Sequence, residues 1–110
     1  MKFDPSEDRW LNAFKKALDR EFPGDVQQVF VYGSRARGDC DPDSDLDVLL
    51  VVRDGAARRA VAMRQAGYLL AADGEVVPSI LVYTAGEWEL RRQSRSPFRR
   101  AVDRDKVRVL

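Results

Sequence analysis

Residues 29–52 read VFVYGSRARGDCDPDSDLDVLLVV, a stretch in which a polar segment separates two apolar runs. Two runs of apolar, β-branched and aromatic residues, Val26 to Tyr32 and Leu46 to Val52, are predicted to be strands. The first run ends abruptly at Gly33-Ser34, and a polar, turn-rich segment over residues 35–44 follows it. The second run is apolar after Asp47, so we expect it to be buried on both faces of a sheet.

Helical patterns lie on both sides of these strands. The N-terminal segment has Asp4 as N-cap, Pro5 at the first helical position and Glu7 completing a capping box, and it ends at Phe22-Pro23-Gly24. A second helix is predicted from Ala56 to Leu70. We expect its inner side to carry four residues: Ala62, Ala66, Leu69 and Leu70.

The C-terminal third adds two strands and two helices. Val76 to Tyr83 is a predicted strand, in which Pro78 favours an edge position or an irregular start. A capping box over Thr84 to Glu87 begins a helix, and Ser96-Pro97 begins a last short one. Val107 to Leu110 is a candidate edge strand. These elements predict an α/β (α+β) fold, a small mixed or antiparallel sheet flanked by helices.

Composition excludes several classes of function. A chain of 110 residues predicts a single domain over residues 1–110, and a net charge of +1 argues against nucleic acid as a direct ligand. The chain has no histidine, which removes His-based nucleophilic sites and the usual zinc sites, and one cysteine, which cannot form an intramolecular disulfide. We find no signal peptide or bilayer-spanning run, so we expect a cytoplasmic protein without membrane contact.

Asp45 and Asp47 are the strongest candidates for chemistry. At positions i and i+2 of a strand their side chains point to the same face, with Cα atoms roughly 6.5 Å apart. Two carboxylates at this spacing can converge on hard divalent cations, and Mg²⁺ suits such a site because it also takes water and phosphate oxygens. Charge directly before a buried strand is costly, which favours a functional role over a solvated turn.

Gly33 and Ser34 predict a phosphate cradle. Glycine at a strand end permits a sharp turn and close approach of a ligand, and Ser34 at the start of a short helix would present its backbone N–H and hydroxyl. If the two strands pair antiparallel, this turn meets Asp45 at one edge of the sheet. Arg35 or Arg37 could add positive charge there.

The motif Gly-Ser, ten residues, Asp-x-Asp resembles that of the minimal nucleotidyltransferase family, within the DNA polymerase β-like superfamily. The resemblance is carried by these residues: Gly33, Ser34, Asp45 and Asp47, with Arg35, Gly38, Ser44 and Leu46. It implies the polymerase β-like fold, two Mg²⁺ ions at Asp45 and Asp47, and ATP or another nucleoside triphosphate bound at Gly33, Ser34, Arg35 and Ser44. It also implies an antitoxin that pairs with a HEPN-domain ribonuclease toxin, in some cases by transferring AMP to a toxin tyrosine.

One departure from the family pattern leaves an alternative open. The superfamily usually supplies a third carboxylate from a later strand, and here Pro78 or Ser79 stands at the expected place. Glu75 is a candidate metal ligand if the strand starts early, and Asp73 is a weaker one. Without a third acid the domain could be a catalytically weak module that neutralises a toxin by binding alone.

The remaining polar patterns are typical of ordinary surface structure. Asp39, Asp41 and Asp43 are typical of a solvated turn and fail the calcium-loop template, and Cys40 has no base to activate it. The arginines over residues 91–100 are typical of a solvated helix face, with a docking patch for an acidic partner or RNA as the functional alternative. Transfer to a small molecule would need a second lobe, which a homo-oligomer could supply.

Overall fold

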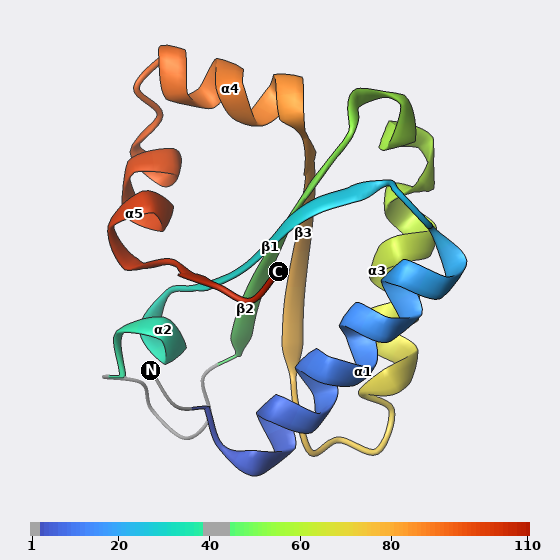
Figure 1. The fold of residues 1–110 in the computed structure, drawn as a ribbon. Coiled ribbons are helices and arrows are strands. Elements are labelled where there is room, and N and C mark those ends of the chain that lie inside the picture. The colour runs from blue at the N-terminus through green and yellow to red at the C-terminus, as the bar shows by residue number, and fades with distance from the viewer. Residues whose placement is uncertain (1–2, 39–44) are drawn as a thin grey trace.

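A computed structural model describes residues 3–38 and 45–110. The strands within them form one sheet in the order β3-β2-β1-β4 (Figure 1). Their bounds are Val26–Tyr32 for β1, Leu46–Val52 for β2, Pro78–Thr84 for β3 and Val107–Arg108 for β4. Strand β1 is antiparallel to β2 and β4, whereas β2 is parallel to β3. The sheet is therefore mixed, which confirms the predicted fold class, and the first two strands have the antiparallel pairing that was assumed for the site.

Helices cover both faces of this sheet. Their bounds are Pro5–Glu21 for α1, Ser34–Arg37 for α2, Ala60–Leu70 for α3, Ala85–Gln93 for α4 and Pro97–Asp105 for α5, with a 3₁₀ helix η1 at Asp54–Arg59. Helices α1 and α3 lie side by side on one face, and α4 and α5 lie on the opposite side (Figure 1). Both predicted capping boxes are present: Asp4 accepts from the N–H of Glu7, and Thr84 accepts from the N–H of Glu87.

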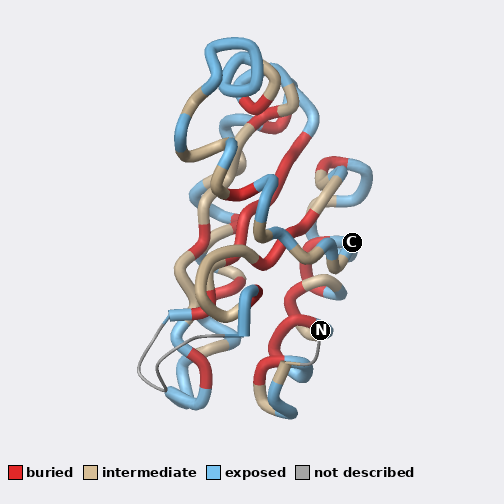
Figure 2. The backbone as a smooth tube through the Cα atoms, turned by 90° about the vertical axis from the view of Figure 1, so that its left-hand side faces the viewer, coloured by how far each residue is buried: buried red, intermediate tan, exposed pale blue. Residues whose placement is uncertain are grey.

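Each face of the sheet has its own hydrophobic core, because successive strand residues point to opposite sides. The larger core joins α1 and α3 to the sheet through residues such as Phe14, Leu18, Val48 and Met63. The smaller core consists of Phe30, Leu49, Val51, Trp88 and Val102, from β1, β2, α4 and α5. Burial is accordingly concentrated in the strands and along the inner sides of the helices (Figure 2).

The predicted helix from Ala56 to Leu70 is wrong in its start and in most of its inner face, although Ala66 is partly buried and packs against the larger core as predicted. A 3₁₀ helix occupies residues 54–59 and α3 begins only at Ala60. The buried residues of α3 are Met63 and Gly67, whereas Ala62, Leu69 and Leu70 are exposed. Gly67 explains the difference, because a Cβ there would lie 2.5 Å from Ile80 Cδ1, so α3 packs with its smallest residue against the sheet.

The third strand begins at Pro78, two residues later than predicted, and ends at Thr84. Pro78 lies on an edge strand, as its missing N–H requires. Strand β4 is shorter than predicted, although Val109 N–H still donates to Val29 O at 2.8 Å. Within the described ranges, no helix has the length and apolar character needed to cross a membrane.

Candidate active site

Gly33 turns the chain at the end of β1 and lies against a carboxylate of β2. Its φ of +76° lies in the left-handed region that favours glycine. A Cβ at this position would lie 2.5 Å from Asp47 Oδ2, closer than a side chain tolerates. Ser34 then begins α2, as predicted. The glycine turn and the second aspartate are thus brought into contact where β1 ends and β2 begins, at one end of the two central strands.

Asp47 is flanked by one residue from each neighbouring strand. Antiparallel pairing puts Tyr32 opposite Asp47, and parallel pairing puts Ser79 beside it. Register partners point to the same face, so the three side chains share the face that α4 and α5 cover farther along the sheet. Asp45, two residues earlier and exposed, points to the same side by strand alternation.

The surroundings of Asp47, at the end of β1 and the start of β2, disfavour negative charge. Burial, and then the neighbouring Asp45 carboxylate, raise the pKa of Asp47 above its ordinary value. Burial, together with the charges of Asp47 and Tyr83, raises the pKa of Tyr32 to about 12, so its phenol is neutral. In residues 3–38 and 45–110, no Lys or Arg forms an ion pair with either aspartate. A cation would therefore stabilise both carboxylates.

The arginines of α2 are tied to neighbouring helices. Arg35 forms a 3.3 Å ion pair with Glu7 of α1, whose side chain is only 7% exposed. Arg37 forms a 2.9 Å ion pair with Asp105 at the end of α5. These contacts hold α2 in place beside the glycine turn. A direct contact of Arg35 with a nucleotide stays a prediction.

Several predicted residues lie outside the described part of the chain: Asp39, Cys40, Asp41, Asp43 and Ser44. Of the candidate third ligands, Glu75 forms a 3.2 Å ion pair with Arg9, and Asp73 accepts the Glu75 backbone N–H. Ser79 stands beside Asp47, where the family pattern expects an acid. No group of three candidate metal ligands occurs in the part that the structure describes. A metal-binding role of Glu75 stays a prediction.

Tyr32 is the site residue that the sequence analysis did not assign, and the register decides that Ser79, not Pro78, stands beside Asp47. Tyr32 precedes the glycine turn, so the assumed antiparallel pairing already placed it near the second strand. Its exact partner depends on the register, and that register contains an irregularity between Val26 and Gln28. Sequence alone therefore gave no means to align Tyr32 with Asp47.

The profile of the nucleotidyltransferase domain family matches residues 11–104. The chain belongs to this family. The match spans the glycine turn, both aspartates and the helices that flank the sheet, which confirms the resemblance to polymerase β-like nucleotidyltransferases.

Individual relatives of this nucleotidyltransferase-family chain match over shorter stretches. Two proteins of Methanocaldococcus jannaschii, each provisionally named a protein adenylyltransferase, are 35% identical over 46 residues and 39% identical over 44 residues. These stretches are 42% and 40% of this chain and 46% and 44% of the relatives, so the similarity spans less than half of each. A crystal structure of a Sulfolobus solfataricus protein, provisionally described as a nucleotidyltransferase, aligns with 97% of this chain and 87% of its own. The sequence identity is 25% and the TM-score is 0.49.

Proposed function

We propose that this domain transfers AMP from ATP to a hydroxyl group of a partner protein and that it requires Mg²⁺. The observation that carries the proposal is the packing of Gly33 against Asp47, which joins a glycine turn to two strand carboxylates at one sheet edge. Membership of the nucleotidyltransferase family supports nucleotidyl transfer. The names of the two M. jannaschii relatives support a protein as acceptor.

The carboxylate oxygens of Asp45 and Asp47 fit Mg²⁺ as ligands. Asp45 and Asp47 repel each other, and burial makes the ionised form of Asp47 costly, so a divalent cation would relieve both effects. Carboxylate oxygens are hard donors that Mg²⁺ prefers. When bound, Mg²⁺ would neutralise phosphate charge and align the reacting groups. Two ions, with Glu75 as a further ligand, remain part of the proposal.

The residues of the chain act mainly by positioning. Gly33 leaves room for a triphosphate to approach the backbone, and Ser34 contributes its N–H and hydroxyl, with Arg35 and Ser44 completing the nucleotide contacts. The acceptor hydroxyl then releases its proton to solvent as its oxygen forms a bond to the α-phosphorus, the bond between the α-phosphorus and the bridging oxygen of the β-phosphate breaks, and pyrophosphate leaves. Holding these groups in line accounts for much of the rate enhancement in such reactions.

The test is transfer of label from α-labelled ATP to the protein encoded beside this chain, with Mg²⁺ present. We expect Asp45→Asn plus Asp47→Asn, or removal of Mg²⁺ by chelation, to lower transfer by about 10²-fold or more. A control that replaces two exposed α1 carboxylates, Asp8→Asn plus Asp19→Asn, should leave transfer unchanged. Transfer that survives the change at Asp45 and Asp47 would show that the chemistry lies elsewhere.

A second candidate function is neutralisation by binding alone. It is favoured by Ser79, which stands beside Asp47 where a third carboxylate is expected. On this alternative, the Asp45→Asn plus Asp47→Asn variant still neutralises its partner. If this variant forms the complex but no longer neutralises, catalysis carries the function.

The biological setting that we propose rests on the family resemblance. The partner would be a HEPN-type ribonuclease toxin, and this chain its cytoplasmic antitoxin. Co-expression of the neighbouring reading frame with and without this chain tests the pairing, with growth arrest only in its absence as the expected result. A neighbour without any effect on growth would contradict the antitoxin role.

A further inference from the structure

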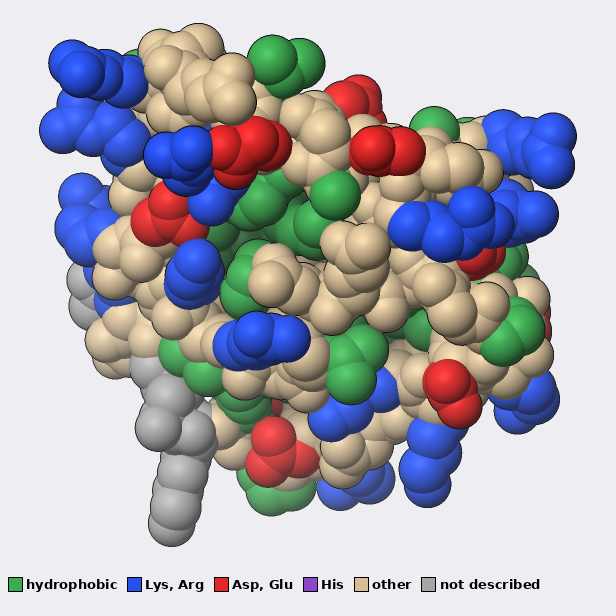
Figure 3. Space-filling model, turned by 45° about the horizontal axis from the view of Figure 1, so that its top comes forward, with side chains coloured by type: hydrophobic (Ala, Val, Ile, Leu, Met, Phe, Trp, Pro, Cys, Tyr) green, Lys and Arg blue, Asp and Glu red, His purple; other side chains and the backbone are tan. Residues whose placement is uncertain are grey.

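Positive charge is gathered at the C-terminal end of the chain, on α4, α5 and β4. Residues 85–110 contain eight Arg and Lys but four Asp and Glu, although the whole chain carries a net charge of only +1. Figure 3 shows Lys and Arg side chains crowded at the left of the view with a few acidic groups among them, and further Lys and Arg side chains at the right and along the lower side. The basic surface is therefore local and does not reflect the overall composition.

The centre of this surface is a hollow of about 420 Å³ between α4 and α5, which we call the arginine hollow. It is lined by Arg91, Arg92, Arg95, Arg99, Arg100 and Asp103. Two of these arginines pair with carboxylates of their own helices, Arg92 with Glu89 and Arg99 with Asp103. Among the described residues, no carboxylate pairs with Arg95 or Arg100. Two full positive charges therefore stand at the rim.

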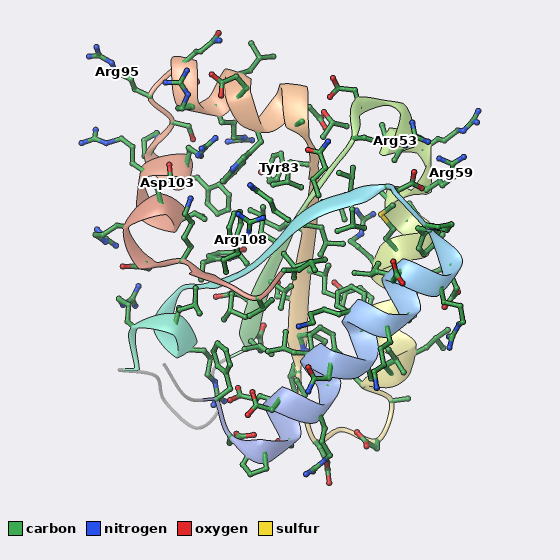
Figure 4. All side chains as sticks on the ribbon, in the orientation of Figure 1. Arg53, Arg59, Tyr83, Arg95, Asp103 and Arg108 are labelled. Carbon is green, nitrogen blue, oxygen red and sulfur yellow. The ribbon has the colours of Figure 1, made fainter. Side chains whose placement is uncertain are left out.

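Arg95 occupies a position where glycine would be more stable. It follows the last residues of α4 with φ of +55°, the one non-glycine residue of the described chain with positive φ. Arg95 N–H donates to Arg92 O and Ser96 N–H donates to Arg91 O, which is the Schellman pattern that usually places glycine at this site. Its side chain extends outward from the turn between α4 and α5 (Figure 4). The local backbone thus does not explain why arginine is present.

The arginine hollow is linked to the face that carries Asp47. The Tyr32 ring, opposite Asp47, packs edge-to-face on Phe98 at 5.7 Å. The Arg91 guanidinium lies 5.9 Å from the same Phe98 ring and 5.1 Å from the Tyr83 ring, and Tyr83 points from β3 toward α5 (Figure 4). One aromatic layer therefore separates the hollow from the candidate active site.

We propose that the arginine hollow is the docking surface for an acidic segment of the protein that accepts the nucleotide. The proposal rests on the proposed function and adds the chemistry of the acceptor. Guanidinium groups pair with carboxylates in two-point geometry, and arginine and aromatic residues are enriched at protein interfaces. Glu89 and Asp103 interrupt the positive charge, and Leu90, next to Arg91, is 64% exposed. These features favour an acidic protein over a continuous phosphate backbone.

The test measures binding separately from catalysis. The probe is a fluorescent random copolymer of Glu and Tyr, with an oligouridylate of equal charge as the nucleic-acid comparison, and the readout is fluorescence anisotropy. We expect the wild-type chain to bind the copolymer more tightly than the oligouridylate. We expect Arg95→Glu plus Arg100→Glu to weaken copolymer binding about tenfold or more. The matched control is Arg58→Glu plus Arg64→Glu, which changes net charge equally on η1 and α3 and should weaken binding far less.

A second variant separates docking from folding. Arg95→Gly should raise Tm, because glycine suits the positive φ, and should still weaken copolymer binding several-fold. Three results would each overturn the proposal. They are an equal loss of copolymer affinity in the two double variants, tighter binding of the oligouridylate than of the copolymer by the wild-type chain, and unchanged copolymer affinity in Arg95→Gly. The Asp45→Asn plus Asp47→Asn variant, which we expect to be inactive in AMP transfer, should still bind the copolymer. The docking proposal can therefore be tested whether or not AMP transfer is confirmed.

Discussion

Gly33 and Asp47 depend on each other at the scale of single residues. The turn can adopt its left-handed backbone only because the residue is glycine, and the Asp47 carboxylate occupies the space that any larger residue would need. The two constraints are separable, because Gly24 has nearly the same φ, +77°, and would meet nothing within 4 Å if it carried a Cβ. Gly24 therefore provides a comparison that shares the positive φ and lacks the carboxylate contact.

We expect Gly33→Ala to destabilise the fold by about 2 kcal/mol or more and to abolish nucleotide transfer, because the new Cβ combines backbone strain with displacement of Asp47. Gly24→Ala should cost about 1 kcal/mol from backbone strain alone and leave transfer intact. Urea denaturation and label transfer measure the two effects. Equal stability losses would mean that the Asp47 contact is unimportant.

Asp47 should make the metal-free protein less stable as pH rises. Its pKa is raised in the folded state, so the folded protein binds the proton more tightly than the unfolded chain, and ionisation of Asp47 destabilises the fold. Asp47→Asn should therefore match the wild type below pH 3.8 and exceed its unfolding free energy at neutral pH, by less than about 1 kcal/mol since the group is partly exposed. Thermal unfolding with chelator from pH 3.5 to 7 measures the difference. A variant that is less stable than the wild type at pH 7 would contradict this sign.

At the scale of elements, β3 is an edge strand whose outward N–H groups are largely occupied. Pro78 has no N–H, Ile80 donates to the Tyr68 hydroxyl at 3.2 Å, and Thr84 donates to Glu87 at 2.9 Å. Edge strands with open N–H groups are prone to pair with other chains. Helices α3 and α4 thus protect the edge through one side chain each.

Tyr68→Phe should cost about 1 kcal/mol, because the Ile80 N–H loses its acceptor while the ring stays in place. Tyr83→Phe on the same strand is the control, since no hydrogen bond of the Tyr83 hydroxyl occurs among the described residues, and it should cost less. Denaturation measures both variants, and sedimentation reports whether Tyr68→Phe also increases self-association. Identical stability of the two variants would show that the edge contact contributes nothing.

At the scale of the whole molecule, the α1–α3 layer sits close to the sheet because α3 presents Gly67. A Cβ on Gly67 would lie 2.5 Å from Ile80 Cδ1 and 3.1 Å from the Phe14 ring. Trp10 of α1 also donates its indole N–H to Gly67 O at 2.9 Å. Two helices and the edge strand therefore meet at one residue.

Gly67→Ala should destabilise the protein by about 1–2 kcal/mol, because overpacking outweighs the gain of up to about 1 kcal/mol in helix propensity. Ile80→Val removes the Cδ1 atom that the new Cβ would meet, so the double variant should be more stable than the sum of the single changes predicts, by about 1 kcal/mol. Chemical denaturation of the four proteins gives this coupling. Additive effects would mean that the helix simply moves away.

Most of the fold could be predicted because its signals are local. Both capping boxes, the first two strands and the edge position of Pro78 follow from residues close together in the chain. The inner face of α3 was predicted wrongly for a tertiary reason. Leu69 is apolar but 75% exposed, whereas Gly67 is buried. Close packing against Ile80 admits only the smallest residue, and this requirement overrides hydrophobicity. Periodicity alone cannot reveal such a choice.

By itself, the sequence determined the spacing of the glycine turn and the two aspartates, and the helices and strands that carry them, since these depend on neighbours a few residues away. Only the tertiary structure decided that Tyr32 and Ser79 flank Asp47, that Arg35 pairs with Glu7, and that the aromatic layer lies beside the arginine hollow. These contacts join segments far apart in the chain. They depend on strand register and helix placement, which hydrophobic burial sets for the molecule as a whole.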